Sequence, residues 1–433
     1  MIRSRCGIVA AGMLALALTA LTAPAAAQTL AIEGGTVHPV SGASYTGTVV
    51  VRDGMIEAAG PDVAAPAGAD VIDARGLHVY PGLFNAWTIL GLVEIDSVPA
   101  TLDQAELGDT PHLLAVEGVH PASEIIPVTR ENGTTHALTA PIGGPWAGQA
   151  SVILLDGWTV EEMEVEKSVG VVLEWPSLAT REFDFSTFSV REKKFSEAKR
   201  DYDRTVGELG DWIAAARQYD HARSNAGSAV AVEQDHALEA IARVTRGELP
   251  LLVVADRARA IRDAVAFAEE HGLRLVVASG RDAAKEADLL AEKKVPVILN
   301  SVQALPVEED DPYDGPFAAP GELHRAGVPI AFGTFDASNA RALPYEAATA
   351  VAFGLDAEAA LRALTLGAAE VLGLDDRLGS IDAGKWANLI VTDGDPLEVR
   401  TAVRHVIVRG RDVDLSNRHS RSYELYRSRP DPR

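Results

Sequence analysis

Between residues 79 and 332 the chain alternates short apolar runs with helical patterns, and this alternation constrains the fold more than any other feature. Helical patterns separate the later runs, for example over residues 259–270 and 283–292. Strand–helix alternation of this kind predicts a parallel sheet or a (β/α) barrel. Residues 151–155 supply a possible extra strand. The apolar runs are Val79–Leu83, Thr134–Ala140, Val169–Leu173, Leu251–Val254, Leu273–Val277, Val295–Leu299 and Val328–Phe332.

Both ends of the chain show a different sequence pattern, in which short β-type runs alternate with turn signals. Asp53-Gly54 follows such a run near the start, and Arg409-Gly410 follows one near the end. We therefore expect both ends to form one small β domain with the barrel inserted between them. The expected domains are residues 28–78 with 380–415 for the β domain, 79–379 for the barrel and 416–433 for a C-terminal tail.

The first residues have the pattern of a secretory signal. Arg3 and Arg5 precede an apolar stretch, and the small residues Ala25 to Ala27 then form a cleavage motif before Gln28. This predicts a signal peptide over residues 1–27 and an exported, most simply periplasmic, protein. The only cysteine, Cys6, lies inside this segment, so the rest of the chain can form no disulfide or thiolate metal site.

The chain is acidic, with 62 Asp and Glu against 39 Lys and Arg and a formal net charge of −23. Such a charge disfavours binding to nucleic acid, and it disfavours anionic membrane surfaces once the leader is cleaved. Residues 189–246 form a long, highly charged helical region, and its charges are typical of a solvent-exposed helix face. Residues 308–320 are rich in Asp, Glu and Pro, and we expect a loop near the barrel mouth.

The strongest local motif is Tyr80-Pro81-Gly82-Leu83-Phe84-Asn85-Ala86-Trp87-Thr88-Ile89. It resembles the Pro-Gly-Leu-Ile-Asp-Ala-His-x-His pattern of the amidohydrolase superfamily, particularly its exported imidazolonepropionase-like branch. The resemblance covers roughly residues 29 to 420. Further matching segments are Asn132–Thr135, Gly143–Gln149, Ala359–Thr365, Leu378–Lys385 and Gly394–Leu397.

The resemblance implies a distorted (β/α)8 TIM-like barrel on a β-sandwich made from both chain ends. It also implies a hydrolase acting on C–N bonds through a divalent metal, which lowers the pKa of a bound water and polarises a carbonyl. Imidazole and carboxylate ligands should meet at the carboxyl end of the barrel. We expect no such metal site here, and zinc or manganese only if a site is relocated. The matching ligand positions hold Trp87, Ile89, Val254, Ser279 and Phe335.

Other polar residues follow the predicted strands and could serve a site at the barrel mouth. The weak catalytic candidates are Asp256, Asp336 and His136, and the ligand-binding candidates are Trp87, Arg257, Arg281, Asn339 and Arg341. Trp87 could equally fill the metal cavity. Glu94, Asp103 and Asp282 share the same placement, and helix capping is the alternative for Asp256 and Asp282.

His112, His120 and His136 could build a relocated metal site, whereas the other histidines His221, His236, His271 and His324 lie in helical surroundings.

Three functions remain open at this stage. The first is a family member without the usual metal-dependent reaction, which binds a small molecule or peptide or assists a catalytically competent relative. The second is an active amide or cyclic-amide hydrolase with a relocated or metal-free site. The third is a structural or interaction protein, which a large exposed apolar patch would favour.

Overall fold

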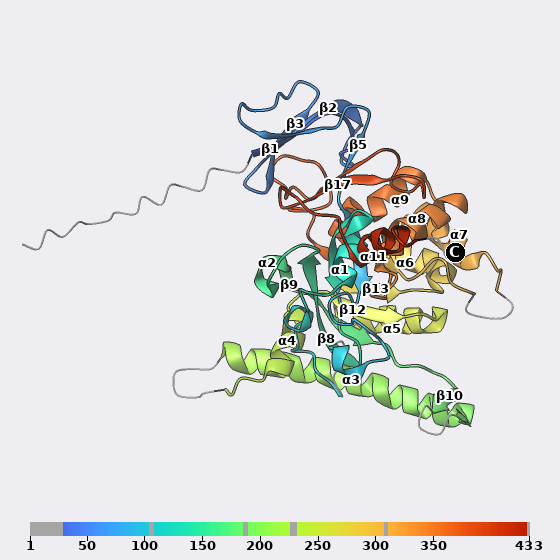
Figure 1. Ribbon diagram of the computed structural model, residues 1–433. Helices are drawn as coiled ribbons and strands as arrows, with labels where there is room; N and C mark the ends of the chain where they lie inside the picture. The colour runs from blue at the N-terminus through green and yellow to red at the C-terminus, as the bar shows by residue number, and fades with distance from the viewer. Residues whose placement is uncertain (1–28, 104–107, 185–188, 226–231, 307–310, 431–433) are drawn as a thin grey trace, which may run out of the picture.

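The computed structural model describes residues 29–103, 108–184, 189–225, 232–306 and 311–430 (Figure 1). It has the mixed α/β architecture predicted from the sequence, with two eight-stranded sheets, called sheet A and sheet B. The predicted signal peptide and Cys6 lie outside the described residues, as does the start of the predicted acidic loop. In the part of the chain that is described, no helix combines the length and apolar character needed to cross a membrane.

Sheet B forms a nearly closed barrel, as predicted. Its strands pair in parallel except β8, which runs antiparallel to both neighbours. The first and last strands meet where the backbone N–H groups of Thr334 and Phe335 donate to the carbonyl oxygen of Trp87 at 2.9 and 3.0 Å. In spatial order the strands are β6 (Leu83–Thr88), β7 (Thr134–Thr139), β8 (Trp146–Leu154), β9 (Glu164–Glu174), β12 (Leu251–Ala255), β13 (Leu275–Ser279), β14 (Val297–Leu299) and β15 (Ile330–Phe332).

Helices cover the outside of the barrel, which explains the continuous apolar runs in the sequence. Every residue of β6, β7 and β8 is buried, as expected for strands covered on both faces. The α-helices are α1 (Ile125–Glu131), α2 (Val160–Met163), α3 (Phe195–Ser224), α4 (His236–Thr245), α5 (Ala258–Glu270), α6 (Ala287–Lys293), α7 (Gly315–Arg325), α8 (Leu343–Ala352), α9 (Ala357–Ala363), α10 (Leu366–Leu372) and α11 (Arg418–Arg427). Short 3-10 turns are η1 (Pro99–Thr101), η2 (Ala115–Gly118), η3 (Ala283–Glu286) and η4 (Ala340–Ala342).

Sheet A joins the two ends of the chain, because β16 pairs antiparallel with β5. It is a mixed sheet: β1 pairs antiparallel with β2 but parallel with β4 and β5. The domain boundaries expected from the sequence stay a prediction. The strands are β1 (Thr29–Val37), β2 (Tyr45–Arg52), β3 (Met55–Gly60), β4 (Asp70–Asp73), β5 (His78–Pro81), β16 (Leu389–Thr392), β17 (Val403–Val408) and β18 (Arg411–Asp412).

Gly82 connects the last residue of β5 in sheet A to the first residue of β6 in the barrel. The apolar run predicted as one barrel strand is divided here: its first part is β5 of sheet A, and the barrel strand β6 begins at Leu83. Gly82 donates its N–H to Asn388 of the sheet A side, while Leu83 donates to Gly133 beside the barrel. A Cβ at residue 82 would lie 2.1 Å from Thr135 Oγ1, so the close approach requires glycine. Sheet A therefore sits at the amino end of β6.

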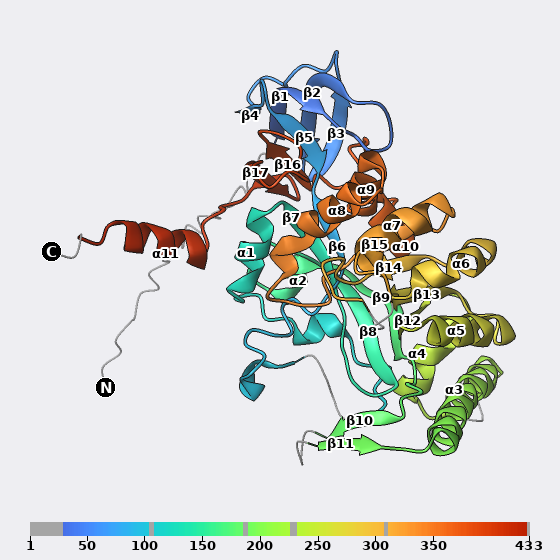
Figure 2. The same cartoon turned by 90° about the vertical axis from the view of Figure 1, so that its right-hand side faces the viewer.

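The charged region predicted between residues 189 and 246 contains the second strand of a hairpin, a long helix and a shorter one. The hairpin pairs β10 (Arg181–Asp184) with β11 (Ser189–Glu192). Helix α3 buries residues on one face, from Ala198 through Leu209 to Tyr219, and leaves its charged residues on the other. Figures 1 and 2 show α3 crossing the molecule at the end far from sheet A.

The side chain of Asn85 ties the first barrel strand to the last, and its removal should destabilise the fold. Asn85 Nδ2 donates to Thr334 Oγ1 at 2.9 Å, and Asn85 Oδ1 accepts from the Thr334 N–H at 3.2 Å in a fully buried setting. Asn85→Ala should lower the free energy of unfolding by about 1–3 kcal/mol, since a buried donor and acceptor lose their partner. Urea unfolding measures this change.

Asn225→Ala is the matched control, because that amide donates to the His221 carbonyl at an exposed helix end. Its effect should stay within about 0.5 kcal/mol. Equal effects of the two substitutions would show that the Asn85–Thr334 contact does not hold the barrel closed.

Candidate functional site

Polar residues end four neighbouring parallel strands at the carboxyl end of the barrel. Glu174 ends β9, Asp256 follows β12, Ser279 ends β13 and Asn300 follows β14. Ser279 Oγ donates to Asp256 Oδ1 at 2.5 Å, and Asn300 Nδ2 donates to Ser279 Oγ at 2.9 Å. These four residues, called the mouth cluster, occupy the face that carries function in barrels of this kind.

Glu174 has the most altered acidity of the carboxylates in the mouth cluster. Burial, and then the negative charge of Asp256, raise the pKa of Glu174 to about 7. Both effects disfavour the ionised form, the first by removing water and the second by repulsion. Near neutral pH the carboxyl group of Glu174 is therefore poised between acid and base, whereas the Asp256 carboxylate accepts the short hydrogen bond from Ser279.

A buried carboxylate on helix α8 positions the loop that follows β14. Glu346 is only 6% exposed, and it accepts hydrogen bonds from Ser301 Oγ at 3.1 Å and from the Gln303 N–H at 3.0 Å. Asn300 Oδ1 in turn accepts from the Ser301 N–H at 2.6 Å. The amide of Asn300 is thus fixed on one side by this loop and on the other by Ser279.

The backbone is strained at two residues of this end of the barrel. Ser279 has φ 73° and Phe335 has φ 54°, in the left-handed region that non-glycine residues seldom adopt. Such conformations persist only where the surroundings over-determine them, and they gather at functional sites. At Ser279 the strained residue is the one that carries the hydroxyl of the mouth cluster.

Aromatic side chains fill the space between the first and last barrel strands. The Trp87 indole is only 2% exposed and stacks on the Phe335 ring, with centroids 5.2 Å apart and planes 14° apart. A Cβ on Gly333 would lie 2.7 Å from the Trp87 Cβ, so Trp87 approaches the backbone directly after β15 closely. Ile89, the neighbouring ligand position of the resemblance, packs against a separate apolar cluster.

The residues present do not fit a metal ion of the family type. In residues 29–430, leaving out the undescribed gaps, no three His, Cys, Asp or Glu side chains come together as a metal would need. A divalent ion of this class needs several nitrogen or oxygen ligands at one point. The five positions named by the resemblance offer an indole, two aliphatic chains, a hydroxyl and a phenyl ring.

The three predicted catalytic candidates have separate partners. Asp256 belongs to the mouth cluster. The Asp336 carboxylate accepts from the N–H and the amide of Asn339, at 2.9 and 3.2 Å, in a local turn. His136 is buried against Phe84, and burial lowers its pKa to about 3, so its ring is neutral. His136 Nδ1 lies 2.6 Å from Thr135 Oγ1, while Nε2 has no hydrogen-bond partner among the described residues.

Sequence reasoning missed Glu174. Its signal was present, because it is the first polar residue after the apolar run Val169–Leu173, at the end of a predicted barrel strand. Asp256, which was expected either at the mouth or as a helix cap, uses its carboxylate on Ser279. Asp282 takes the capping role instead, since its carboxylate accepts the Ala258 N–H at 3.1 Å at the start of α5.

The predicted ligand-binding residues are dispersed. Trp87 is buried, whereas Arg257, Asn339 and Arg341 are exposed. Arg281 is exposed as well, and it donates to the Leu305 carbonyl at 2.8 Å. Their roles stay predictions. Of the other residues expected at the mouth, Glu94 accepts a hydrogen bond from Ser123 Oγ at 2.5 Å, and Asp103 is exposed. The loop histidines His112 and His120 are exposed as well.

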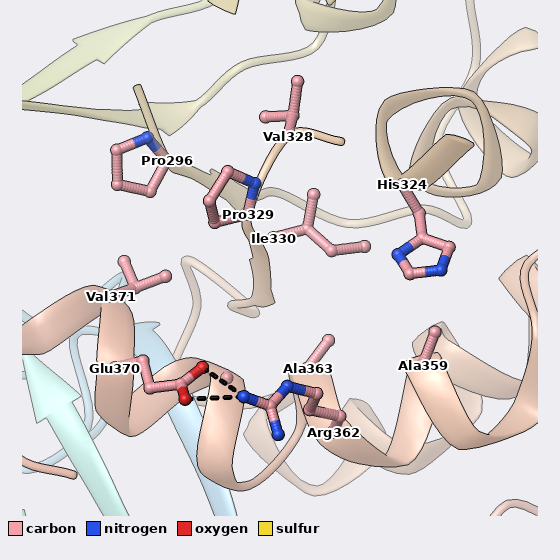
Figure 3. A pocket seen from close by; sticks show the side chains of 11 residues that line it. Pro296, His324, Val328, Pro329, Ile330, Ala359, Arg362, Ala363, Glu370 and Val371 are labelled. Carbon is pink, nitrogen blue, oxygen red and sulfur yellow. Dashed lines mark hydrogen bonds and ion pairs between the residues drawn. The ribbon is translucent and has the colours of Figure 1, made fainter. Parts of the chain in front are cut away.

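A distinct pocket of about 310 Å³ lies at the opposite end of the barrel (Figure 3). Pro296 and Pro329, which precede β14 and β15, line one side of it. Across the pocket an Arg362 nitrogen lies 2.5 and 2.7 Å from the two Glu370 carboxylate oxygens. This pocket is separate from the mouth cluster.

Comparison with known proteins identifies the lineage of this barrel. The model of the amidohydrolase family matches residues 191–413, just over half of the chain. The solved structure of an amidohydrolase from Thermotoga maritima is 27% identical, with a TM-score of 0.76, and the match covers 89% of this chain and 99% of that one.

Two curated relatives are also similar. The amidohydrolase tasK of Hapsidospora irregularis is 26% identical over 432 residues, which is 88% of this chain and 42% of tasK. The dihydroorotase of Geobacter sulfurreducens is 46% identical over 57 residues, 13% of each chain. The chain therefore spans less than half the length of the curated relatives it matches.

The raised pKa of Glu174 predicts a pH-dependent stability. The pKa rises from 4.5 in the unfolded chain to about 7 in the folded protein, so between these values the folded protein binds the proton more tightly. The free energy of unfolding should therefore decline as the pH rises through this range. Glu174→Gln should remove that decline, which is measured as the difference between wild-type and variant unfolding from about pH 4 to pH 8.

Glu117→Gln, at an exposed carboxyl group in η2, is the control and should run parallel to the wild type. A Glu174→Gln curve that also runs parallel to the wild type would mean that Glu174 ionises as it does in the unfolded chain.

Proposed function

The chain belongs to the amidohydrolase family, and from this premise we propose that it is a member without the family's metal-dependent hydrolysis. It acts instead as a binding or accessory protein. The single observation that carries this proposal is the Trp87–Phe335 stack, which joins two positions that the resemblance assigns to metal ligands. An indole and a phenyl ring cannot bind a divalent cation as imidazole and carboxylate do.

The mouth cluster supports binding of a small polar molecule or a peptide. Asn300 and Ser279 supply amide and hydroxyl groups, and Glu174 and Asp256 supply carboxyl groups on one rim. A catalytically competent relative is the partner expected for an accessory role. The leader-like segment at residues 1–27 supports export to the periplasm as part of this proposal.

A second candidate function rests on the chemistry of the same cluster. Ser279 Oγ lies 2.5 Å from Asp256 Oδ1, which is the contact a nucleophile makes with its base. In this candidate Ser279 attacks an amide carbonyl carbon and passes its proton to Asp256. The protonated form of Glu174 gives its proton to the leaving amine as the C–N bond breaks. Water then attacks the carbonyl carbon of the acyl-serine ester and gives a proton to Glu174, while Asp256 returns its proton to Ser279 Oγ as the ester bond breaks and the carboxylic acid leaves.

The first proposal predicts that the protein retains little metal. After incubation with zinc or manganese and desalting, elemental analysis should find far less than one ion per chain, because the family ligand positions hold no imidazole or carboxylate. His112→Ala/His120→Ala serves as the control, since these exposed imidazoles could hold adventitious ions. Stoichiometric metal that survives in this control, together with chelator-sensitive amide hydrolysis, would overturn the proposal.

The second candidate predicts metal-independent hydrolysis that depends on the mouth cluster. If an amide or cyclic amide is cleaved, Asp256→Asn should lower kcat by about 10²–10⁴, the range for losing a general base. Asp336→Asn is the matched control, because that carboxylate lies in a local turn after β15. Steady-state rates with and without chelator decide the question. Equal rates in the two variants would remove the mouth cluster from the mechanism.

A further inference from the structure

Helix α11 stands away from the rest of the molecule. Figure 2 shows it projecting from the body on the side of α1, and none of its residues is buried. It nevertheless carries three large apolar or aromatic side chains, Tyr423, Leu425 and Tyr426, with exposed fractions of 64%, 64% and 56%. We call residues 418–430 the arm. Large side chains clustered this way on an isolated helix mark an interaction surface.

The base of the arm is rigidly attached. Asn417 is fully buried; its side chain donates to Glu131 Oε2 at 2.6 Å, and its oxygen accepts from the His419 and Ser420 N–H groups. Ser420 Oγ accepts the Asn417 N–H and completes a capping box. The arm is therefore held in one direction before any partner binds, which lowers the entropic cost of binding.

The arm differs in charge from the chain that bears it. It contains four arginines and one glutamate, whereas the whole chain has 62 acidic against 39 basic residues. Arginines also lie over its aromatic rings, with Arg429 Cζ 4.2 Å from the centre of the Tyr426 ring. A basic aromatic segment of this kind fits an acidic surface that presents apolar side chains.

Such a surface lies beside the base of the arm. Trp158 is 90% exposed, and the exposed carboxylates of Glu161 and Glu162 follow it at the start of α2. Trp158 lines a pocket of about 300 Å³ together with Met163 and with Arg421 of the arm. The pocket and the arm are thus neighbours on one face of the chain, although the arm itself points away.

We propose that two copies of this chain form a dimer by exchanging arms, with the aromatic side chains of each arm packed against Trp158 of the other copy. Because Arg421 borders the pocket, a two-fold axis near this residue would carry each arm to the pocket of its partner. A two-fold interface needs one self-complementary surface, and a basic aromatic arm beside an exposed tryptophan that two exposed carboxylates follow supplies it. This inference is independent of the proposed function.

The experiment is sedimentation of the purified protein over a range of concentrations. The wild type should form dimers, and raising the salt from about 0.05 to about 0.5 M should weaken them, since screening reduces the attraction between arm and pocket. Tyr423→Ser/Leu425→Ser/Tyr426→Ser and, separately, Trp158→Ser should each raise the dissociation constant by more than about tenfold. Val399→Ser, at a side chain that is 74% exposed elsewhere, should leave it unchanged.

Mixing the two variants gives a sharper test. Each variant alone loses both arm–pocket contacts of its dimer. A mixed pair regains one contact, between the intact arm of Trp158→Ser and the intact pocket of the arm variant, so it should associate more tightly than either variant alone. A wild type that stays monomeric, including one that binds only a different protein, would overturn the proposal. So would a dimer that neither variant weakens.

Discussion

The rest of the structure depends on the contact between the first and last barrel strands. The Trp87 carbonyl accepts two backbone N–H groups of the segment after β15, and the Asn85 side chain binds Thr334 beside it. In the same place the Trp87 indole stacks on Phe335. Closure of the barrel and filling of its mouth are therefore properties of one small region. A metal site at these positions would need this packing replaced.

Next to this apolar region the barrel keeps a row of polar residues, and their order along the sheet gives them their chemistry. Glu174 ends β9 and Asp256 follows the adjacent strand β12, so the two carboxyl groups lie at the same end of the barrel. Asp256 accepts the hydrogen bond from Ser279. Burial, and then the negative charge of Asp256, raise the pKa of Glu174 to about 7. A carboxyl group with such a pKa suits acid–base chemistry, and polar groups gathered in this way also suit recognition of a polar ligand.

The fold could be predicted well from the sequence because its signals are local. Apolar runs such as Leu251–Val254 became barrel strands, and the β-rich ends joined through β5 and β16. The site was harder, since it depends on which side chains face each other across strands far apart in sequence. Asp256 was a candidate, but its partner Ser279 was read only as a lost ligand position. Glu174 was missed, because its place after an apolar run does not reveal that Asp256 lies close enough to raise its pKa.

The strained backbone at Ser279 and Phe335 connects the mouth cluster with the positions named by the resemblance. Both residues occupy positions that the resemblance assigns to metal ligands, and both keep positive φ angles. Such strain persists where the surrounding structure determines the backbone conformation. At Ser279 the same conformation presents the hydroxyl to Asp256 and Asn300. The strained backbone therefore orients the groups of the mouth cluster, but it does not name their reaction, which is why the family and the activity must be argued separately.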